Sequence, residues 1–246
     1  MLTWGPEMGT LLELAGVRAG YGGGDILQGV DLSVDEGSLT CIVGPNGAGK
    51  STVLRVISGL LRPTAGTVRF RGDSLAGRSP RSILARGIVQ VPQERSLFPT
   101  MSVWENVRLG AFSVRDRRLV ERRLATVVEM FPIVAERRRE PAASLSGGQQ
   151  KIVEFARALM LDPALLILDE PSMGLDPKTR TLVFNTVREM NRSGRTLLLV
   201  EQNARSGLGI ASHGVVMESG RVRLEGPGAE VLNNPEIARL YLGAPA

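Results

Sequence analysis

Residues 44–51 read Gly-Pro-Asn-Gly-Ala-Gly-Lys-Ser, and this stretch decides the fold. The segment before it, Leu39–Val43, is short, apolar and β-branched, which is typical of a buried strand. The segment after it, residues 52–57, carries apolar side chains at helical spacing. A glycine-rich loop between a strand and a helix can turn its backbone N–H groups inward and hold an anion at the positive end of the helix. The stretch therefore predicts a phosphate-binding loop.

Single residues of this loop have distinct expected roles. The three glycines allow the tight turn, Lys50 reaches the outer phosphates of a nucleotide, and the Ser51 hydroxyl can ligate Mg²⁺. A glycine turn with a stray lysine is the alternative, but the chain has only three lysines among its 30 Lys and Arg residues, and one stands where the motif requires it. We expect a nucleotide site made of Gly44, Pro45, Asn46, Gly47, Ala48, Gly49, Lys50, Ser51 and Thr52.

Composition limits the class of protein. The chain has 246 residues, enough for one large α/β domain or a core with an inserted subdomain. A hydrophobic content of 43% excludes disorder, and a net charge of +5 suits an anionic partner such as nucleotide, lipid headgroups or nucleic acid. The single cysteine, Cys41, cannot form an internal disulfide, which fits a reducing cytosol. Because no apolar stretch approaches the ~20 residues of a membrane span, we expect a soluble intracellular chain.

Strand-like and helical segments alternate along the chain, which implies a mostly parallel sheet. We expect an α/β fold of the P-loop NTPase (RecA-like) type, with an N-terminal antiparallel β-layer and an inserted helical subdomain. The strands predicted besides Leu39–Val43 are residues 11–17, 31–34, 66–70, 88–91, 165–168 and 196–200, with a helix over 178–190.

The same patterns divide the chain into parts. Residues 10–246 are expected to form a single domain. Its nucleotide-binding core comprises 10–92 and 162–226, its arginine-rich helical insertion 93–161, and its helical tail 227–246. Residues 1–9 are expected to be a flexible end.

Two carboxylates follow the apolar run of residues 164–168. Ligands of open parallel sheets bind beyond the carboxyl ends of the strands, where Asp169 and Glu170 emerge. Asp169 is suited to hold Mg²⁺, directly or through water, and Glu170 can polarise a water that attacks the γ-phosphate. An acidic turn after a core strand is the alternative.

Residues 145–150 read Leu-Ser-Gly-Gly-Gln-Gln and precede a helix predicted over 151–161. Ser146 is a suitable N-cap, and the glycines allow backbone N–H groups to approach an anion. From spacing alone, a plain helix start after a loop is the favoured explanation of the segment.

Together these motifs resemble ATP-binding cassette (ABC) ATPases. Residues 145–149 are similar to the signature sequence of that family, Gln93 to its glutamine loop, and residues 172–176 to its D-loop, which includes Asp176. Tyr21 stands where the family places an aromatic ring on adenine. The elements follow the family's order over roughly residues 10–225.

The resemblance implies a head-to-tail pair of cassettes with ATP and Mg²⁺ at the shared seam. The signature residues Leu145, Ser146, Gly147, Gly148 and Gln149 of one cassette would cover ATP on the other. It also implies that Ser51, Gln93 and Asp169 serve the metal, that Gln93 senses the attacking water, and that a cytoplasmic helix of a membrane-embedded partner docks near Gln93.

The chain departs from the family at the switch position. Most members carry a histidine after the strand that follows the D-loop, whereas Gln202 stands here. A glutamine amide can donate a hydrogen bond to a phosphate oxygen but cannot carry a positive charge. We expect Glu170, Gln93 and Gln202 to form the catalytic set, with slower hydrolysis. The only histidine, His213, is expected to be structural.

The string Val-Glu-Gln-Asn at residues 200–203 resembles ATPase subunits of branched-chain amino acid uptake systems, as do residues 241–243. Relatives of these systems serve urea or amides, and Gln93 and Asp176 depart from subfamily members that carry glutamate and alanine there. This resemblance implies transmembrane permease subunits, a second ABC ATPase subunit (a heterodimer, or else a homodimer) and, indirectly, a periplasmic solute-binding protein. The expected location is the cytoplasmic face of the inner membrane, as a peripheral subunit.

Other function classes share some of these motifs. ABC-type DNA-repair heads need a long coiled coil, and residues 93–161 show no sustained heptads. Translation factors of the family usually carry two cassettes, a P-loop kinase lacks the signature helix, and a GTPase needs an Asn-Lys-x-Asp motif that is missing from the sequence. We expect no nucleic acid partner. The arginine clusters at 115–118, 122–123 and 137–139 predict either a solvated, salt-bridged face or contact with anionic lipid headgroups.

Overall fold

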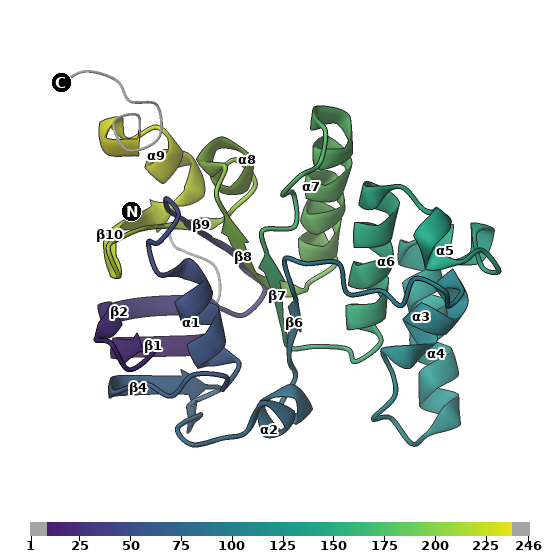
Figure 1. Ribbon diagram of the computed structural model, residues 1–246, viewed down its shortest axis with the longest axis horizontal. Helices are drawn as coiled ribbons and strands as arrows, with labels where there is room; N and C mark the ends of the chain where they lie inside the picture. The colour runs from purple at the N-terminus through teal and green to yellow at the C-terminus, as the bar shows by residue number, and fades with distance from the viewer. Residues whose placement is uncertain (1–8, 238–246) are drawn as a thin grey trace, which may run out of the picture.

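The computed structural model describes residues 9–237, and the expected flexible end lies outside them except for Gly9. Two sheets form the framework (Figure 1). The larger has the order β10-β9-β3-β8-β7-β6, in which all neighbours are parallel except β10 and β9. Its strands are β3 (Leu39–Val43), β6 (Ile88–Val91), β7 (Leu165–Asp169), β8 (Thr196–Glu201), β9 (His213–Glu218) and β10 (Arg221–Pro227).

The smaller sheet is antiparallel, with the order β2-β1-β4-β5. The expected α/β fold with a mostly parallel core and an antiparallel layer is therefore confirmed. The strand predicted over 31–34 was too short: β2 begins at Asp25, because pairing with β1 continues on both sides of Gly29. Gly29 itself has a φ of 84° and is skipped in the register. The strands are β1 (Thr10–Gly20), β2 (Asp25–Asp35), β4 (Ala65–Phe70) and β5 (Asp73–Ser74).

Two apolar cores lie on opposite faces of the large sheet. Successive side chains of a strand point to opposite faces, so Ile42 packs with the antiparallel sheet and α1, whereas Cys41 and Val43 pack with the helices of the other face. The strands β3 and β8 are buried along their whole length. Burial on both faces explains why these strands read as continuous apolar runs without alternation.

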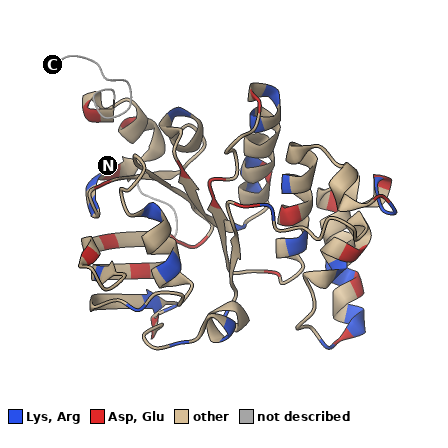
Figure 2. Cartoon of the chain, viewed as in Figure 1, with Lys and Arg blue, Asp and Glu red and all other residues tan. Residues whose placement is uncertain are grey.

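Helices α3 to α6 come between β6 and β7 and lie to one side of the sheets (Figure 1). Blue ribbon segments, which mark Lys and Arg positions, recur along α4 in Figure 2. Members of two arginine clusters are paired: Arg123 lies 3.9 Å from Asp162, and Arg137 lies 2.8 Å from Glu140. The helices are α1 (Lys50–Ile57), α2 (Pro80–Ala85), α3 (Val103–Leu109), α4 (Arg117–Met130), α5 (Ile133–Glu136), α6 (Gly147–Leu159), α7 (Pro177–Arg192), α8 (Ala204–Leu208) and α9 (Gly228–Leu232), with a 3₁₀ turn at Ala142–Ser144.

The helix predicted over 151–161 begins earlier, at Gly147. Ser146 accepts a hydrogen bond from the Gln149 N–H, and the Gln149 side chain accepts one from the Ser146 N–H. This capping box satisfies the first backbone donors, so the helix begins in spite of two glycines at its start. Among residues 9–237, no helix has both the length and the apolar character that crossing a bilayer requires.

Candidate active site

The phosphate-binding loop joins β3 to α1, as the sequence predicts. The backbone at Gly49, the N-cap of α1, has a φ of 103°, and no side chain caps the helix. A Cβ on Gly44 would lie 2.4 Å from the Met217 carbonyl oxygen, so only glycine fits. Gly44 therefore packs directly against the backbone of β9. The first N–H groups of α1 have no side-chain partner, so they can bind an anion.

Lys50 is 5% exposed and crosses the mouth of this loop. Its Nζ donates to the Gly44 carbonyl at 2.8 Å and to the Pro45 carbonyl at 3.2 Å, and lies 3.5 Å from Glu170 Oε1. The ammonium group thus joins the phosphate loop to the carboxylate after β7. In a nucleotide complex, phosphate oxygens can replace the two carbonyl oxygens as hydrogen-bond acceptors of Lys50 Nζ.

Glu170 has a left-handed backbone, with a φ of 42°. A non-glycine residue rarely adopts this region, and such conformations gather at functional sites. The Glu170 N–H donates to the Val200 carbonyl at 2.9 Å, and Gln93 Nε2 donates to Glu170 Oε2 at 3.4 Å. The structure therefore brings together Lys50, Gln93 and Glu170 from three separate segments.

Asp169 precedes Glu170 and has the electrostatics of a cation ligand. Burial raises the pKa of Asp169, the charge of Glu170 raises it further, and the nearby Lys50, Lys151 and Arg55 oppose the rise. Its Oδ1 is buried without a hydrogen-bond partner among residues 9–237. An orphaned carboxylate oxygen next to a second carboxylate fits a bound divalent cation.

No three His, Cys, Asp or Glu side chains gather as a metal cage in the described part of the chain. Mg²⁺ does not need such a cage, because it keeps several waters and uses one or two carboxylates together with substrate phosphates. The exposed Ser51 hydroxyl, one residue after Lys50, supplies a further oxygen. The residues present therefore fit magnesium held jointly with a nucleotide.

Asp169→Asn is expected to raise the melting temperature of the protein without nucleotide or Mg²⁺. The folded state raises the pKa of this carboxyl, so its charge destabilises the fold at neutral pH. The gain should shrink as pH falls through the raised pKa of the folded state, where Asp169 takes up its proton, and should be gone below the ordinary aspartate value of 3.8. Thermal unfolding in EDTA measures it: ~1 kcal/mol corresponds to a shift of about 2–4 °C in a chain of this size. An unchanged or lower melting temperature contradicts this reading.

Gln202 follows β8, beside the ends of β3 and β7 in the sheet. It shares the lining of one concave surface with Glu170, Gly174 and Arg205. His213 instead begins β9 and pairs with Thr40 near the start of β3. It therefore lies at the amino ends of these parallel strands, whereas the phosphate loop follows the carboxyl end of β3. Its Nε2 lies 3.9 Å from Glu225 Oε2, which agrees with the expected structural role.

Gln202→Ala is expected to lower maximal ATP turnover while the apparent affinity for ATP changes less. The amide can donate to a phosphate oxygen, and a single neutral hydrogen bond contributes about 0.5–1.5 kcal/mol, or roughly two- to tenfold in rate. Steady-state phosphate release at saturating ATP measures the change. Asn233→Ala, which removes an amide that follows α9 and does not line this concave surface, serves as the control. Equal turnover in Gln202→Ala and the wild type would remove Gln202 from the site.

The signature segment lies against α7 and the turn before it. A Cβ on Gly148 would lie 2.2 Å from Thr179 Cγ2, and one on Gly147 would lie 3.3 Å from Leu175 Cδ2. Within residues 9–237, no hydrogen bond or ion pair joins residues 145–149 to residues 44–52 of the same chain. The chain alone therefore does not unite the signature with its own phosphate loop.

Two other expected site residues have contacts of their own. The Tyr21 side chain is exposed, and its ring centroid lies 5.5 Å from the Arg55 guanidinium carbon, a cation–π contact. Asp176 caps α7 by accepting from the N–H groups of Lys178 and Thr179 at 3.0 and 3.1 Å. A hydrogen bond from the Thr179 side chain lowers the pKa of Asp176 most, and the two backbone N–H groups lower it further.

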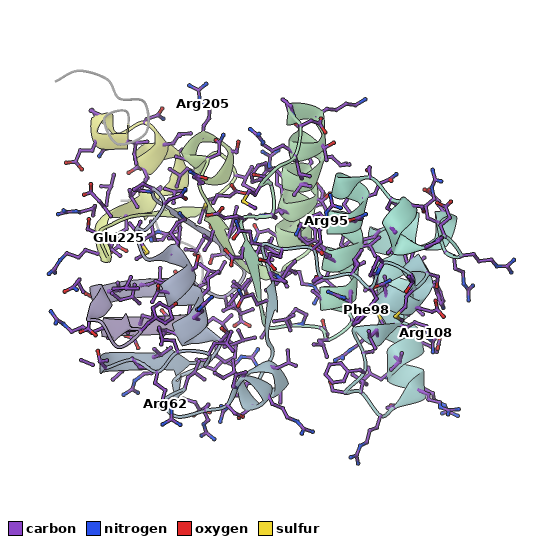
Figure 3. All side chains as sticks on the ribbon, in the orientation of Figure 1. Arg62, Arg95, Phe98, Arg108, Arg205 and Glu225 are labelled. Atoms are coloured by element: carbon purple, nitrogen blue, oxygen red, sulfur yellow. The ribbon has the colours of Figure 1, made fainter. Side chains whose placement is uncertain are left out.

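The sequence reasoning did not single out two residues that the fold brings to this region. Arg95 lies between α7 and α6 in Figure 3, with its Nη2 3.9 Å from the position of a Cβ on Gly147. Glu201 is 2% exposed and accepts from the Ser172 N–H at 3.2 Å, so it joins the end of β8 to the D-loop-like turn. Burial raises the pKa of Glu201. Arg95 belongs to no motif, and the string at residues 200–203 contains Glu201 without giving it a role, because the neighbours of both residues come from distant segments.

Known proteins share both sequence and fold with this chain. The ABC transporter family profile matches residues 27–173. The chain is 36% identical over 233 residues to the high-affinity branched-chain amino acid transport ATP-binding protein BraG of Pseudomonas aeruginosa, covering 95% of this chain and 100% of that protein.

Solved structures agree with the sequence match. The ADP conformation of an ATP-binding cassette of an ABC transporter superposes with a TM-score of 0.87 at 30% identity, over 96% of this chain and 100% of that one. A dimeric bacterial ABC transporter cassette superposes with a TM-score of 0.75 at 27% identity, over 88% and 98%. With a phosphate loop, a buried lysine and two carboxylates at one sheet edge, the chain belongs to the ABC transporter family and is an ATP-binding, ATP-hydrolysing cassette.

Proposed function

We propose that this chain is the ATP-hydrolysing subunit of a membrane importer for branched-chain amino acids. The observation that carries the proposal is the contact of Glu170 with both Lys50 and Gln93, in a chain of which 95% matches BraG. Importers of urea or amides are the alternative within the same class. ABC-type DNA-repair heads fit poorly, because the longest helix between β6 and β7 has 14 residues.

In this proposal, the phosphate loop and Lys50 bind the phosphates of ATP, and Tyr21 stacks on adenine. Magnesium, when bound by Ser51 and Asp169 near Gln93, neutralises phosphate charge. Glu170 takes a proton from the attacking water, Gln93 orients that water, and Gln202 donates to a phosphate oxygen. Residues 145–149 of a second cassette complete the site, which agrees with their separation from residues 44–52 in one chain.

The proposed permease contact is the groove between β6 and α6. Leu84, Leu109 and Phe112 line it together with Ser96, Glu154 and Arg157. Phe112 is 71% exposed and Leu109 is 37% exposed, so two large apolar side chains of this groove face solvent together, as at a contact site. An amphipathic cytoplasmic helix of a transmembrane permease subunit would cover it, and this would place the chain at the cytoplasmic face of the membrane.

Genetic replacement in the organism of origin tests the function. Deleting the chain should abolish high-affinity uptake of radiolabelled leucine, and the wild-type chain should restore uptake where Glu170→Gln does not. Affinity purification of the wild-type chain should recover polytopic membrane proteins. If the deletion strain takes up leucine normally but loses urea or amide uptake, the substrate is urea or an amide instead. Recovery of nucleic acid without membrane proteins would overturn the transport role.

A further inference from the structure

A cluster of charged side chains lies on α6, away from the phosphate loop. Lys151, Glu154 and Arg157 follow one another at intervals of three residues and face the segment after β6. Glu154 is 2% exposed and Lys151 is 7% exposed. Lys151 Nζ forms an ion pair with Glu154 Oε2 at 2.6 Å. We call these three residues, with Ser96, the loop clamp.

The loop clamp holds the segment at two places. Glu154 Oε1 accepts from the Ser96 N–H at 2.6 Å and from the Ser96 hydroxyl at 3.0 Å. Arg157 Nη1 donates to the Ser96 carbonyl at 2.7 Å, and its Nη2 donates to the Ser96 hydroxyl. Lys151 Nζ donates to the Pro92 carbonyl at 3.4 Å. Gln93 lies between these two anchors.

Packing a helix with buried charges costs free energy of desolvation. Well-packed apolar side chains of similar volume often stabilise a fold equally or better, because charges lose their hydration. Burial indeed lowers the pKa of Arg157. What the charges add is direction: three of the bonds fix a backbone atom of Pro92 or Ser96 relative to α6, and two more hold the Ser96 hydroxyl.

That precision matters because Gln93 reaches Glu170 over a long hydrogen bond of 3.4 Å. A further displacement of a few tenths of an ångström would break it. The clamp also lies near the cation site, since the charge of Lys151 acts on the pKa of Asp169.

We propose that Glu154, supported by Lys151 and Arg157, is a positioning residue for ATP hydrolysis: it holds residues 92–96 on α6 so that Gln93 meets Glu170. The inference rests on the proposed role of Gln93 in hydrolysis. In this arrangement, the segment after β6 and helix α6 move as one unit.

A double-mutant cycle on the purified full-length chain tests this. Glu154→Ala should lower maximal ATP turnover by about tenfold, the scale of a displacement of less than 1 Å, with the KM for ATP within about threefold of wild type. In the Gln93→Ala background, the same change should cost less than about twofold, because the positioned group is already missing. Glu154→Gln keeps the acceptor for the Ser96 N–H and should recover turnover to within about threefold of wild type.

Glu121→Ala is the matched control, since Glu121 pairs with Arg108 at 2.8 Å on the exposed surface of the same helical region. If Glu154→Ala fails to fold, Ser96→Ala takes the place of Glu154→Ala in the double-mutant cycle. Ser96 is half-exposed, and its hydroxyl makes two of the clamp bonds. The clamp proposal is overturned if Glu154→Ala lowers turnover equally in the wild-type and Gln93→Ala backgrounds, or if it does not lower turnover at all. If Gln93→Ala alone keeps full turnover, the proposed role of Gln93 fails; if only the clamp variants are silent, that role stands and the clamp fails.

Discussion

Glu170→Gln is expected to abolish most ATP turnover and to leave ATP binding in place. Glu170 lies 3.5 Å from Lys50 and 3.4 Å from Gln93, and its strained backbone fixes the carboxylate at this position. Glutamine preserves the shape but cannot accept a proton from water. General-base catalysis contributes about 10²–10⁴-fold, so turnover should fall at least a hundredfold.

Single-turnover hydrolysis and equilibrium binding of ATP separate the two effects. Glu189→Gln is a suitable control, because Glu189 pairs with Arg192 on the surface of α7. Near-normal hydrolysis in Glu170→Gln would assign the base to another group. Loss of binding would show that the carboxylate is structural.

Lys50→Ala is expected to weaken the binding of ATP itself. The ammonium group is buried and held by two loop carbonyls, so it is already in place for the phosphates. A hydrogen bond to a charged group contributes about 1.5–3 kcal/mol, which corresponds to roughly 10- to 150-fold in the dissociation constant. Titration of a fluorescent ATP analogue measures this loss.

Lys178→Ala provides a matched control, because Lys178 is an exposed lysine in the first turn of α7. Its affinity for ATP should equal that of the wild type. Unchanged affinity in Lys50→Ala would mean that the backbone N–H groups of the loop alone carry phosphate binding. Circular dichroism of both variants separates a lost contact from a lost fold, since Lys50→Ala also leaves Glu170 without its cation.

The local motifs are the part of the site that sequence reasoning could find. The phosphate loop, the carboxylates at the end of β7 and the Ser146 cap each depend on residues within a few positions of one another. Backbone conformation is set by such near neighbours, through glycine at positive φ, apolar periodicity and capping. For the same reason the strands β3, β6, β7 and β8 could be predicted closely, while β2 could not, because its first residues depend on pairing with β1.

The sequence by itself determined the fold class, the phosphate loop and the order of the motifs, since each is written in short stretches of chain. Only the tertiary structure decided that Gln93 contacts Glu170, that Glu154 anchors Ser96, and that His213 stands at the far edge of the sheet. These facts depend on which segments pack side by side. That arrangement follows from burying both faces of one sheet, and no short stretch of sequence contains it.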